Sequence, residues 1–235
     1  MRIVERPSPN HDARPDGARI DMLVLHYTGM RTAEDALARL CDPAAKVSAH
    51  YTIDSDGIVY AHVPEERRAW HAGVSCWAGE RNVNARSIGI EMVNPGHEFG
   101  YVPFAKEQIA ALIDLGEGIF ARHAIPAHRV VGHSDVAPGR KEDPGELFPW
   151  QCLAEYGIGV WPRNGGHILS GPFEAALARW GYGMPPDVDW PIEKIVSAFQ
   201  RHYRPAKIDG EWDQECSRLL AALLAQCEAA MQQTA

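Results

Sequence analysis

The first part of the chain alternates between short apolar runs bounded by polar or turn-forming residues and longer stretches with apolar residues at helical spacing. The short runs predict β-strands at residues 21–28, 51–53, 58–60, 87–94 and 129–133. The longer stretches predict helices at residues 32–40 and 105–123. Residues 54–57 (DSDG) tolerate positive φ and join two of the strands, which indicates a hairpin. The order β-α-β-β-β-α-β predicts an α/β fold with a mixed central sheet flanked by helices.

The pattern changes near residue 166, after which it predicts three helices and no strand. The helices are expected near residues 171–179, after Asp189-Trp190-Pro191 to about residue 202, and after Asp213. For the second helix, Asp189 is expected to cap the first turn and Pro191 to occupy it. The separating segments are Pro185-Pro186 and the loop at residues 204–210. This change predicts two domains, at residues 1–165 and 166–235, the second a small three-helix bundle.

Composition narrows the class of protein. The chain has 235 residues, 46% of them apolar, which is enough for a buried core. Its net charge of −8 argues against a nucleic-acid partner, because that affinity comes mainly from Lys and Arg on phosphates. No apolar run is long enough for a spanning helix, so no membrane association is expected. The chain is expected to be a monomer.

The N-terminus and the cysteines bear on location. The first ten residues carry charges and two prolines but no apolar run, unlike a secretory signal. The cysteines are odd in number and form no C-x-x-C pair, so free thiols are expected at Cys41, Cys76, Cys152, Cys216 and Cys227. Both features lead us to expect a cytoplasmic protein, or a periplasmic one if a signal has been removed.

The segment at residues 133–145 (HSDVAPGRKEDPG) carries the clearest chemistry. A histidine at a strand end precedes a loop rich in Pro and Gly, which can turn back so that Asp143 approaches His133. His26, at the end of a neighbouring strand, would complete a set of two imidazoles and one carboxylate. Three such ligands leave a fourth tetrahedral position open for water, as catalytic zinc sites require.

Five separated segments resemble the type 2 family of N-acetylmuramoyl-L-alanine amidases, which includes AmpD- and AmiD-like enzymes. They are residues 24–28 (VLHYT), 48–51 (SAHY), 69–73 (AWHAG), 87–91 (SIGIE) and 132–145 (GHSDVAPGRKEDPG). The resemblance implies a zinc amidase domain at residues 1–165 with the fold that this family shares with peptidoglycan recognition proteins. The tail, with its AFQRH and DG segments, resembles the helical peptidoglycan-binding module of AmiD-type members and implies such a domain at residues 166–235.

Position by position, the resemblance implies one Zn²⁺ held by His26, His133 and Asp143. It implies that Glu91 takes the proton of the attacking water and that Lys141 steadies the oxyanion. The reaction needs these residue types, because an amide is a poor electrophile with a poor leaving group. A carboxylate can carry the proton from water to the leaving nitrogen, and a fixed positive charge stabilises the tetrahedral intermediate.

Three further residues are candidates for substrate binding: His50, Trp70 and His71. Two of them also have a plainer interpretation, since His50 can hydrogen-bond within the sheet and Trp70 can belong to the core. Glu142 and Asp135 are expected to be bystanders, although Asp135 could accept a hydrogen bond that fixes the loop.

The predicted reaction is hydrolysis of the lactyl–L-alanine amide bond in muropeptides or peptidoglycan fragments, with soluble 1,6-anhydro-muropeptides expected in a recycling role. An envelope amidase that trims intact peptidoglycan is one alternative. A non-catalytic peptidoglycan-binding protein is another, although such a protein would be expected to lack a ligand or the water-activating group. A zinc peptidase that cuts the stem peptide is a third, although no H-E-x-x-H motif is present.

Overall fold

The computed structural model describes residues 1–163, 167–183 and 189–233. Its centre is a six-stranded mixed sheet in the order β1-β5-β4-β7-β3-β8. The strands of this sheet are β1 (Arg2–Glu5), β3 (Met22–Tyr27), β4 (Tyr51–Ile53), β5 (Ile58–Ala61), β7 (Ser87–Met92) and β8 (Val130–Gly132). The neighbours β4, β7, β3 and β8 run parallel, whereas β4 and β5 form the antiparallel hairpin that residues 54–57 predict.

Alternation along β3 sends its side chains to two different cores. Leu23 and Leu25 pack with the long helix α4 (Lys106–Arg122) on one face. Met22 and Val24 point to the other face, where they share a core cluster with the C-terminal helices. His26 continues this second face, so the polar end of the strand lies on the side that the C-terminal helices cover.

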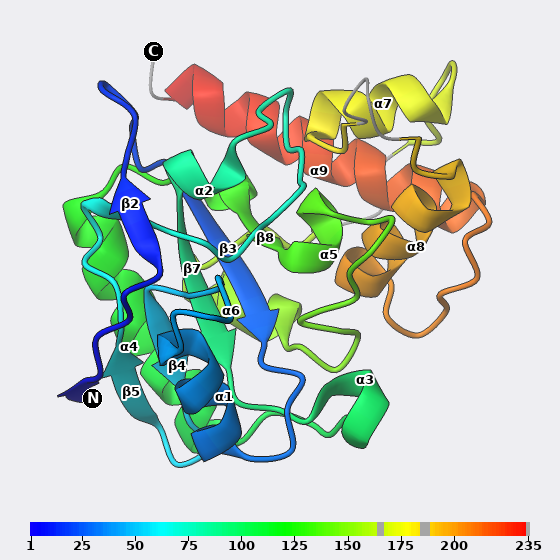
Figure 1. Ribbon diagram of the computed structural model, residues 1–235. Helices are drawn as coiled ribbons and strands as arrows, with labels where there is room; N and C mark the ends of the chain where they lie inside the picture. The colour runs from blue at the N-terminus through cyan, green and yellow to red at the C-terminus, as the bar shows by residue number, and fades with distance from the viewer. Residues whose placement is uncertain (164–166, 184–188, 234–235) are drawn as a thin grey trace.

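The remaining helices cover the sheet and its edges (Figure 1). They are α1 (Ala33–Cys41), α2 (Val83–Arg86), α3 (Gly96–Phe99), α5 (His133–Val136), α6 (Trp150–Glu155), α7 (Phe173–Trp180), α8 (Ile192–Tyr203) and α9 (Gln214–Gln233), with a short 3-10 turn at Ala127–Arg129. Figure 1 shows α7, α8 and α9 gathered on the side of β3 and β8, away from α4. Thr32 caps α1 by accepting a hydrogen bond from the Asp35 N–H at 3.1 Å.

The predicted α/β fold is confirmed, but three strands were not foreseen. These are β1, β2 (His11–Ala13) and β6 (Arg67–Ala69), of which β2 and β6 form a separate antiparallel pair. β2 and β6 are three residues long and polar, so they show no alternation of apolar and polar positions. Their pairing depends on contacts across 56 residues of chain, such as the ion pair between Arg68 and Asp12.

The three predicted C-terminal helices are present as α7, α8 and α9. The expected cap of α8 is wrong: the helix begins at Ile192, and its N-cap is Pro191 with no side-chain hydrogen bond, so Asp189 does not cap it. The domain boundary at residues 165–166 and the Pro185-Pro186 segment lie outside the described residues. The division into two domains stays a prediction, and the C-terminal helices share their core with the sheet.

All five cysteines are free, as their spacing predicts. Among the residues that the structure describes, no helix has both the length and the apolar character needed to cross a membrane.

Candidate active site

The site lies at the carboxyl ends of three parallel strands, the edge at which open α/β sheets bind ligands. His26 is the second-last residue of β3, Glu91 is the second-last residue of β7, and His133 follows β8 directly. His26 and Glu91 are register partners on adjacent strands. Register partners project to the same face of a sheet, so the imidazole and the carboxylate share one side.

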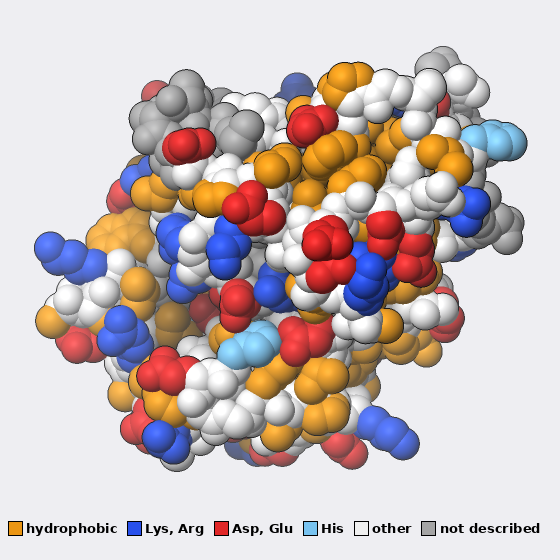
Figure 2. Space-filling view, turned by 90° about the vertical axis from the view of Figure 1, so that its right-hand side faces the viewer, with side chains coloured by type: hydrophobic (Ala, Val, Ile, Leu, Met, Phe, Trp, Pro, Cys, Tyr) orange, Lys and Arg blue, Asp and Glu red, His pale blue; other side chains and the backbone are white. Residues whose placement is uncertain are grey.

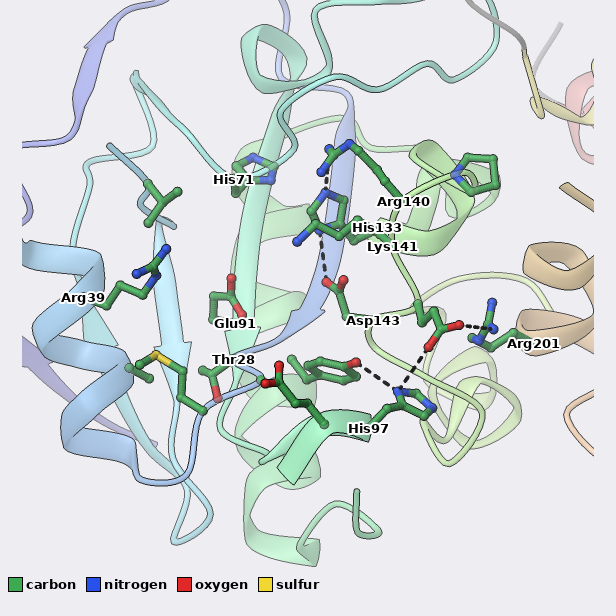
Figure 3. A pocket seen from close by; sticks show the side chains of 18 of the residues that line it. Thr28, Arg39, His71, Glu91, His97, His133, Arg140, Lys141, Asp143 and Arg201 are labelled. Atoms are coloured by element: carbon green, nitrogen blue, oxygen red, sulfur yellow. Dashed lines mark hydrogen bonds and ion pairs between the residues drawn. The ribbon is translucent and has the colours of Figure 1, made fainter. Parts of the chain in front are cut away.

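Three donor atoms from distant parts of the chain converge at this edge. His26 Nδ1 lies 3.0 Å from His133 Nδ1 and 3.0 Å from Asp143 Oδ2, and His133 Nδ1 lies 3.1 Å from Asp143 Oδ2. All three residues are buried, and among the described residues they form the group of His, Cys, Asp and Glu that could hold a metal ion. Figure 3 shows His133 and Asp143 facing each other near Glu91.

The donor set fits zinc. Zn–N and Zn–O bonds of about 2.0–2.1 Å in a tetrahedron place neighbouring donors roughly 3.3 Å apart. The triangle of Nδ1, Nδ1 and Oδ2 is close to that size, and three electron-rich atoms in such proximity call for a cation between them. Two histidines and one carboxylate leave one coordination position open, which is the pattern of catalytic sites.

The loop that follows His133 folds back as the sequence predicts. The Ser134 N–H donates to the Asp143 carbonyl at 2.8 Å. The N–H groups of Arg140 and Lys141 both donate to the Ala137 carbonyl at 3.0 Å. These bonds close the loop and bring the Asp143 carboxylate to the two imidazoles.

Burial and neighbouring charges shift the acid–base properties of the site. Burial, together with His133, lowers the pKa of His26 to about 4. Burial alone would raise the pKa of Asp143, but His133 and His26 outweigh it and hold this pKa well below its usual range. Burial and the charge of Asp143 raise the pKa of Glu91 well above its usual range, while the charge of Lys141 opposes that rise.

Glu91 carries an unused acceptor. Its Oε2 atom is enclosed and has no hydrogen-bond partner among the described residues. A buried, unpaired carboxylate oxygen is costly, so its retention beside a metal-type cluster indicates a group kept for a ligand or a proton. The expectation that Glu91 points away from its apolar neighbours agrees with the alternation of β7, in which Ile90 and Met92 pack into the other core.

A cleft of about 840 Å³ opens over these residues. Its walls come from α1, from α3, from the loop that carries Lys141, and from α8, which contributes Lys194, Ser197 and Arg201. Figure 2 shows acidic and basic side chains interspersed around a hollow on this side of the molecule. The volume lies within the range of small-molecule sites.

Of the other four predicted site residues, three line the cleft and one is enclosed in the sheet. Lys141, Trp70 and His71 line the cleft, although His71 is only 8% exposed. His50 is fully buried: its Nδ1 accepts from the Gly89 N–H at 2.9 Å. This is the hydrogen bond within the sheet that the sequence allowed, and it gives His50 no access to a substrate in the cleft.

Asp135 and Glu142 each have partners. The Asp135 carboxylate accepts from the Gly132 N–H at 2.7 Å, from Tyr182 Oη at 2.6 Å and from His202 Nδ1 at 2.7 Å. It therefore fixes the loop at His133 and ties it to the C-terminal helices. Glu142 lines the cleft, with its carboxylate 3.6 Å from the Arg201 guanidinium.

Three arginines line the cleft, and sequence reasoning singled out none of them: Arg39, Arg140 and Arg201. Arg140 donates to the Ala72 carbonyl through Nη2, and its Nε donates to the Val74 carbonyl at 3.0 Å. Its position beside Lys141 was the one available signal. Arg201 is brought to the cleft by α8, and no local pattern connects that helix with residues 60 positions earlier.

Two imidazoles and a carboxylate with an open side, next to an unpaired glutamate and a lysine, form a candidate metal site of the kind found in hydrolases in which a metal-activated water attacks a carbonyl. The comparisons give the family. Residues 16–146 match the family described as N-acetylmuramoyl-L-alanine amidase. The chain belongs to this family of N-acetylmuramoyl-L-alanine amidases, and the resemblance noted from its five segments is confirmed.

Individual relatives cover different shares of the chain. The chain is 40% identical to the amidase AmiD of Escherichia coli over 94% of its length and 90% of that protein. It is 36% identical to the 1,6-anhydro-N-acetylmuramyl-L-alanine amidase AmpD of Enterobacter cloacae, over 61% of its length and 84% of that protein.

Solved structures agree with this placement. AmiD of E. coli, in complex with anhydro-N-acetylmuramic acid-L-Ala-D-gamma-Glu-L-Lys, superposes with a TM-score of 0.79, covering 90% of this chain and 92% of that one at 38% identity. AmpDh3 of Pseudomonas aeruginosa, in complex with an anhydromuramic pentapeptide, gives a TM-score of 0.80, covering 91% and 94% at 36% identity.

Proposed function

We propose that this amidase is zinc-dependent and hydrolyses the amide between the lactyl group of N-acetylmuramic acid, or its 1,6-anhydro form, and L-alanine. The observation that carries the proposal is the convergence of His26, His133 and Asp143 beside the unpaired carboxylate of Glu91. A non-catalytic binding protein would have no reason to keep both the donor triangle and that buried oxygen.

His26, His133 and Asp143 would hold the ion. When bound, zinc polarises the substrate carbonyl and lowers the pKa of water at the open position to roughly 7. The chain's own contribution is to keep the His26 imidazole neutral and the Asp143 carboxylate ionised, the forms in which these groups bind a metal. The lowered pKa values of His26 and Asp143 act in that direction.

Glu91 moves the proton. Its Oε2 is free of hydrogen bonds within the described chain, so it can accept the proton of the attacking water. The same carboxyl group then donates that proton to the departing L-alanine nitrogen, which would otherwise leave as a poor anion. A raised pKa suits both halves of this task, because the group must bind the proton and release it again.

Lys141 supplies the fixed positive charge. It lines the cleft on the loop between His133 and Asp143, and its charge lowers the pKa of both His26 and Glu91. Because the Lys141 charge reaches both groups in the absence of substrate, it can also stabilise the substrate carbonyl oxygen as that oxygen becomes negative.

The substrate that we propose is a soluble anhydro-muropeptide. Two relatives were solved with anhydromuramyl peptides, and a third is named for the anhydro sugar. The cleft of about 840 Å³ can enclose a sugar and the first stem residues.

We also propose a recycling role in the cytoplasm, which the free thiols suit. Of the C-terminal helices, α8 serves here to complete the cleft wall.

The test is to incubate the zinc-loaded protein with purified anhydro-muropeptide and, separately, with intact sacculi, and to analyse both by mass spectrometry. Free anhydro-sugar and free stem peptide are expected from the soluble substrate. Cleavage confined to bonds within the stem peptide would overturn the amidase proposal. A strong preference for sacculi would leave the bond assignment intact and replace recycling with the trimming of polymer, which the similarity to AmiD over 94% of the chain makes worth testing.

A further inference from the structure

A chain of three buried side chains leads away from the candidate metal centre. His26 turns its second ring nitrogen, Nε2, toward His71 Nδ1 at 3.1 Å, and the two rings meet edge to face at 5.1 Å between centroids. On the far side of the His71 ring, Nε2 lies 3.1 Å from Ser87 Oγ. The Ser87 hydroxyl in turn donates to the Val83 carbonyl at 2.7 Å.

The direction of every bond in this chain follows from its last member. A backbone carbonyl can only accept, so the single proton of the Ser87 hydroxyl is committed to Val83. Ser87 Oγ must then accept from His71, which places the His71 proton on Nε2. His71 Nδ1 is therefore a bare acceptor, and it requires a proton on His26 Nε2.

The second histidine ligand has both kinds of neighbour at its outer nitrogen. His133 Nε2 lies 3.0 Å from the Ala72 carbonyl, which can only accept, and 3.3 Å from Arg140 Nη2, which can only donate. A proton on Nε2 would satisfy the carbonyl and leave Nδ1 bare. Ala72 follows His71 directly, and the N–H groups of both residues donate to Asn84 Oδ1, at 2.8 Å and 3.2 Å. Residues 71 and 72 thus contact both ligand imidazoles: the His71 ring contacts His26, and the Ala72 carbonyl contacts His133.

The sheet makes room for the His71 ring. The face of β7 that carries Glu91 also carries Ser87 and Gly89. A Cβ at position 89 would stand 2.6 Å from His71 Cδ2, closer than real side chains approach. The backbone of Gly89 is not in the left-handed region, so glycine is needed here for space rather than for conformation.

We propose that His71 and Ser87 form a relay that holds His26 in the tautomer protonated at Nε2, which presents a bare Nδ1 to the metal. His71 is a positioning residue: it acts through His26 and has no need to touch the substrate. This inference rests on the proposed metal-dependent function. It departs from the sequence prediction, in which His71 was a candidate for substrate binding.

The chemistry of the relay explains why a histidine serves at position 71. The neutral ring accepts at Nδ1 and donates at Nε2, so it can link a donor and an acceptor on its opposite edges. Outer partners of this kind orient ligand histidines, and their loss typically weakens metal affinity about 10–100-fold.

Two substitutions at position 71 distinguish a relay role of His71 from a role in packing alone. In His71→Asn the amide oxygen can take the place of Nδ1 and still accept from His26. In His71→Gln the amide reaches toward Ser87 and leaves His26 Nε2 without its acceptor. We expect zinc affinity, measured by competition with a chromophoric chelator, to fall about 10–100-fold in His71→Gln and to stay within roughly threefold of the wild type in His71→Asn. Equal losses in both variants would overturn the relay and leave a packing role.

Ser87→Ala tests the far end of the relay with a smaller change. Without the hydroxyl, nothing fixes the His71 proton on Nε2, so zinc affinity is expected to fall about tenfold. Ser217→Ala is the matched control, since Ser217 is also buried but lies on α9, where its hydroxyl accepts a hydrogen bond from the Leu169 N–H. Unchanged affinity in Ser87→Ala would contradict the proposal.

A third measurement uses the zinc-loaded wild type, because without the ion the Asp143 carboxylate, 3.0 Å from His26 Nδ1, can accept a proton from that nitrogen. Nitrogen NMR of histidine side chains at pH 8 distinguishes protonated from bare ring nitrogens, and the His26 signal can be assigned by its absence in His26→Gln. We expect a proton on Nε2 and none on Nδ1, and the reverse tautomer would overturn the relay. A wild type that binds no zinc at all would instead count against the proposed function, so the two failures are distinguishable.

Discussion

His26 on β3 and Glu91 on β7 are direct register partners in the parallel part of the sheet. Neighbouring parallel strands lie about 4.8 Å apart, so one backbone pairing sets the distance between a candidate metal ligand and the candidate proton carrier. Because both residues stand on rigid strands rather than on loops, their relation is fixed by the sheet ladder itself.

Replacement of Glu91 by glutamine should abolish most activity without loss of the metal. Glutamine keeps the size of the side chain but cannot carry the proton from water to the leaving nitrogen, so kcat should fall about 10²–10⁴-fold. The measurement is muropeptide cleavage alongside zinc content by atomic absorption. A variant that retains zinc and near wild-type kcat would remove Glu91 from the proposed role.

Replacement of Lys141 by alanine should lower kcat about 10²–10³-fold, because a stabilising charge at the developing oxyanion is lost. Substrate affinity should change less than kcat, since the charge acts on the intermediate. Lys106→Ala, at the exposed start of α4, is the matched control for the loss of one lysine. A loss confined to KM would indicate that Lys141 binds substrate instead.

Removal of zinc by a strong chelator should abolish cleavage, and added Zn²⁺ should restore it. His26→Ala should not be rescued at the same zinc concentration, because two remaining ligands hold the ion much more weakly. Activity that survives both chelation and His26→Ala would show that the reaction does not depend on this metal site.

The hydrogen bond between Tyr182 and Asp135 should contribute measurably to stability. Tyr182→Phe keeps the ring but removes the donor that reaches the buried carboxylate at 2.6 Å. We expect a loss of about 1.5–3 kcal/mol and a corresponding fall in Tm of roughly 2–4 °C per kcal/mol. Tyr156→Phe is the control, since Tyr156 is 55% exposed, and equal Tm values for the two variants would contradict the prediction.

The metal-free protein should lose stability as the pH falls below about 6.5. Burial lowers the pKa of His26 to about 4 and that of His50 to about 3, and it lowers the pKa of His71 as well. Between these values and the unfolded value of about 6.5, the unfolded chain binds protons that the folded chain does not. Each such histidine therefore costs the folded state up to about 1.4 kcal/mol per pH unit in this range.

Glu91 acts in the opposite sense, because its raised pKa lets the folded protein bind a proton that the unfolded chain releases above about 4.5. Because three histidines destabilise the folded state at low pH and one glutamate stabilises it, acidification should still lower the free energy of unfolding. The measurement is Tm of chelator-treated protein at pH 7.5, 6.5 and 5.5. A constant or rising Tm over this range would show that the histidines are protonated in the folded state.

The strands that build the site could be predicted from the sequence because their signal is local. In β7 the apolar residues Ile88, Ile90 and Met92 alternate with Ser87, Gly89 and Glu91. Such a pattern fixes which side chains share a face before any partner is known. β2 and β6 escaped prediction because neither carries an apolar pattern, and their pairing arises from residues more than 50 positions apart.

The sequence by itself, through its resemblance to the amidase family, predicted the residues of the centre: His26, Glu91, His133, Lys141 and Asp143. Their types agree with what a metal, a proton and an oxyanion require, and the turn-rich loop before Asp143 indicates that the chain can fold back toward His133. Only the tertiary structure decided which ring nitrogens face the centre, that His71 stands behind His26 while His50 is enclosed in the sheet, and that α8 closes the cleft with Arg201. The physical reason is that residue chemistry and alternation are properties of neighbours along the chain, whereas a hydrogen-bond direction or a cleft wall depends on atoms that meet only after the chain has folded.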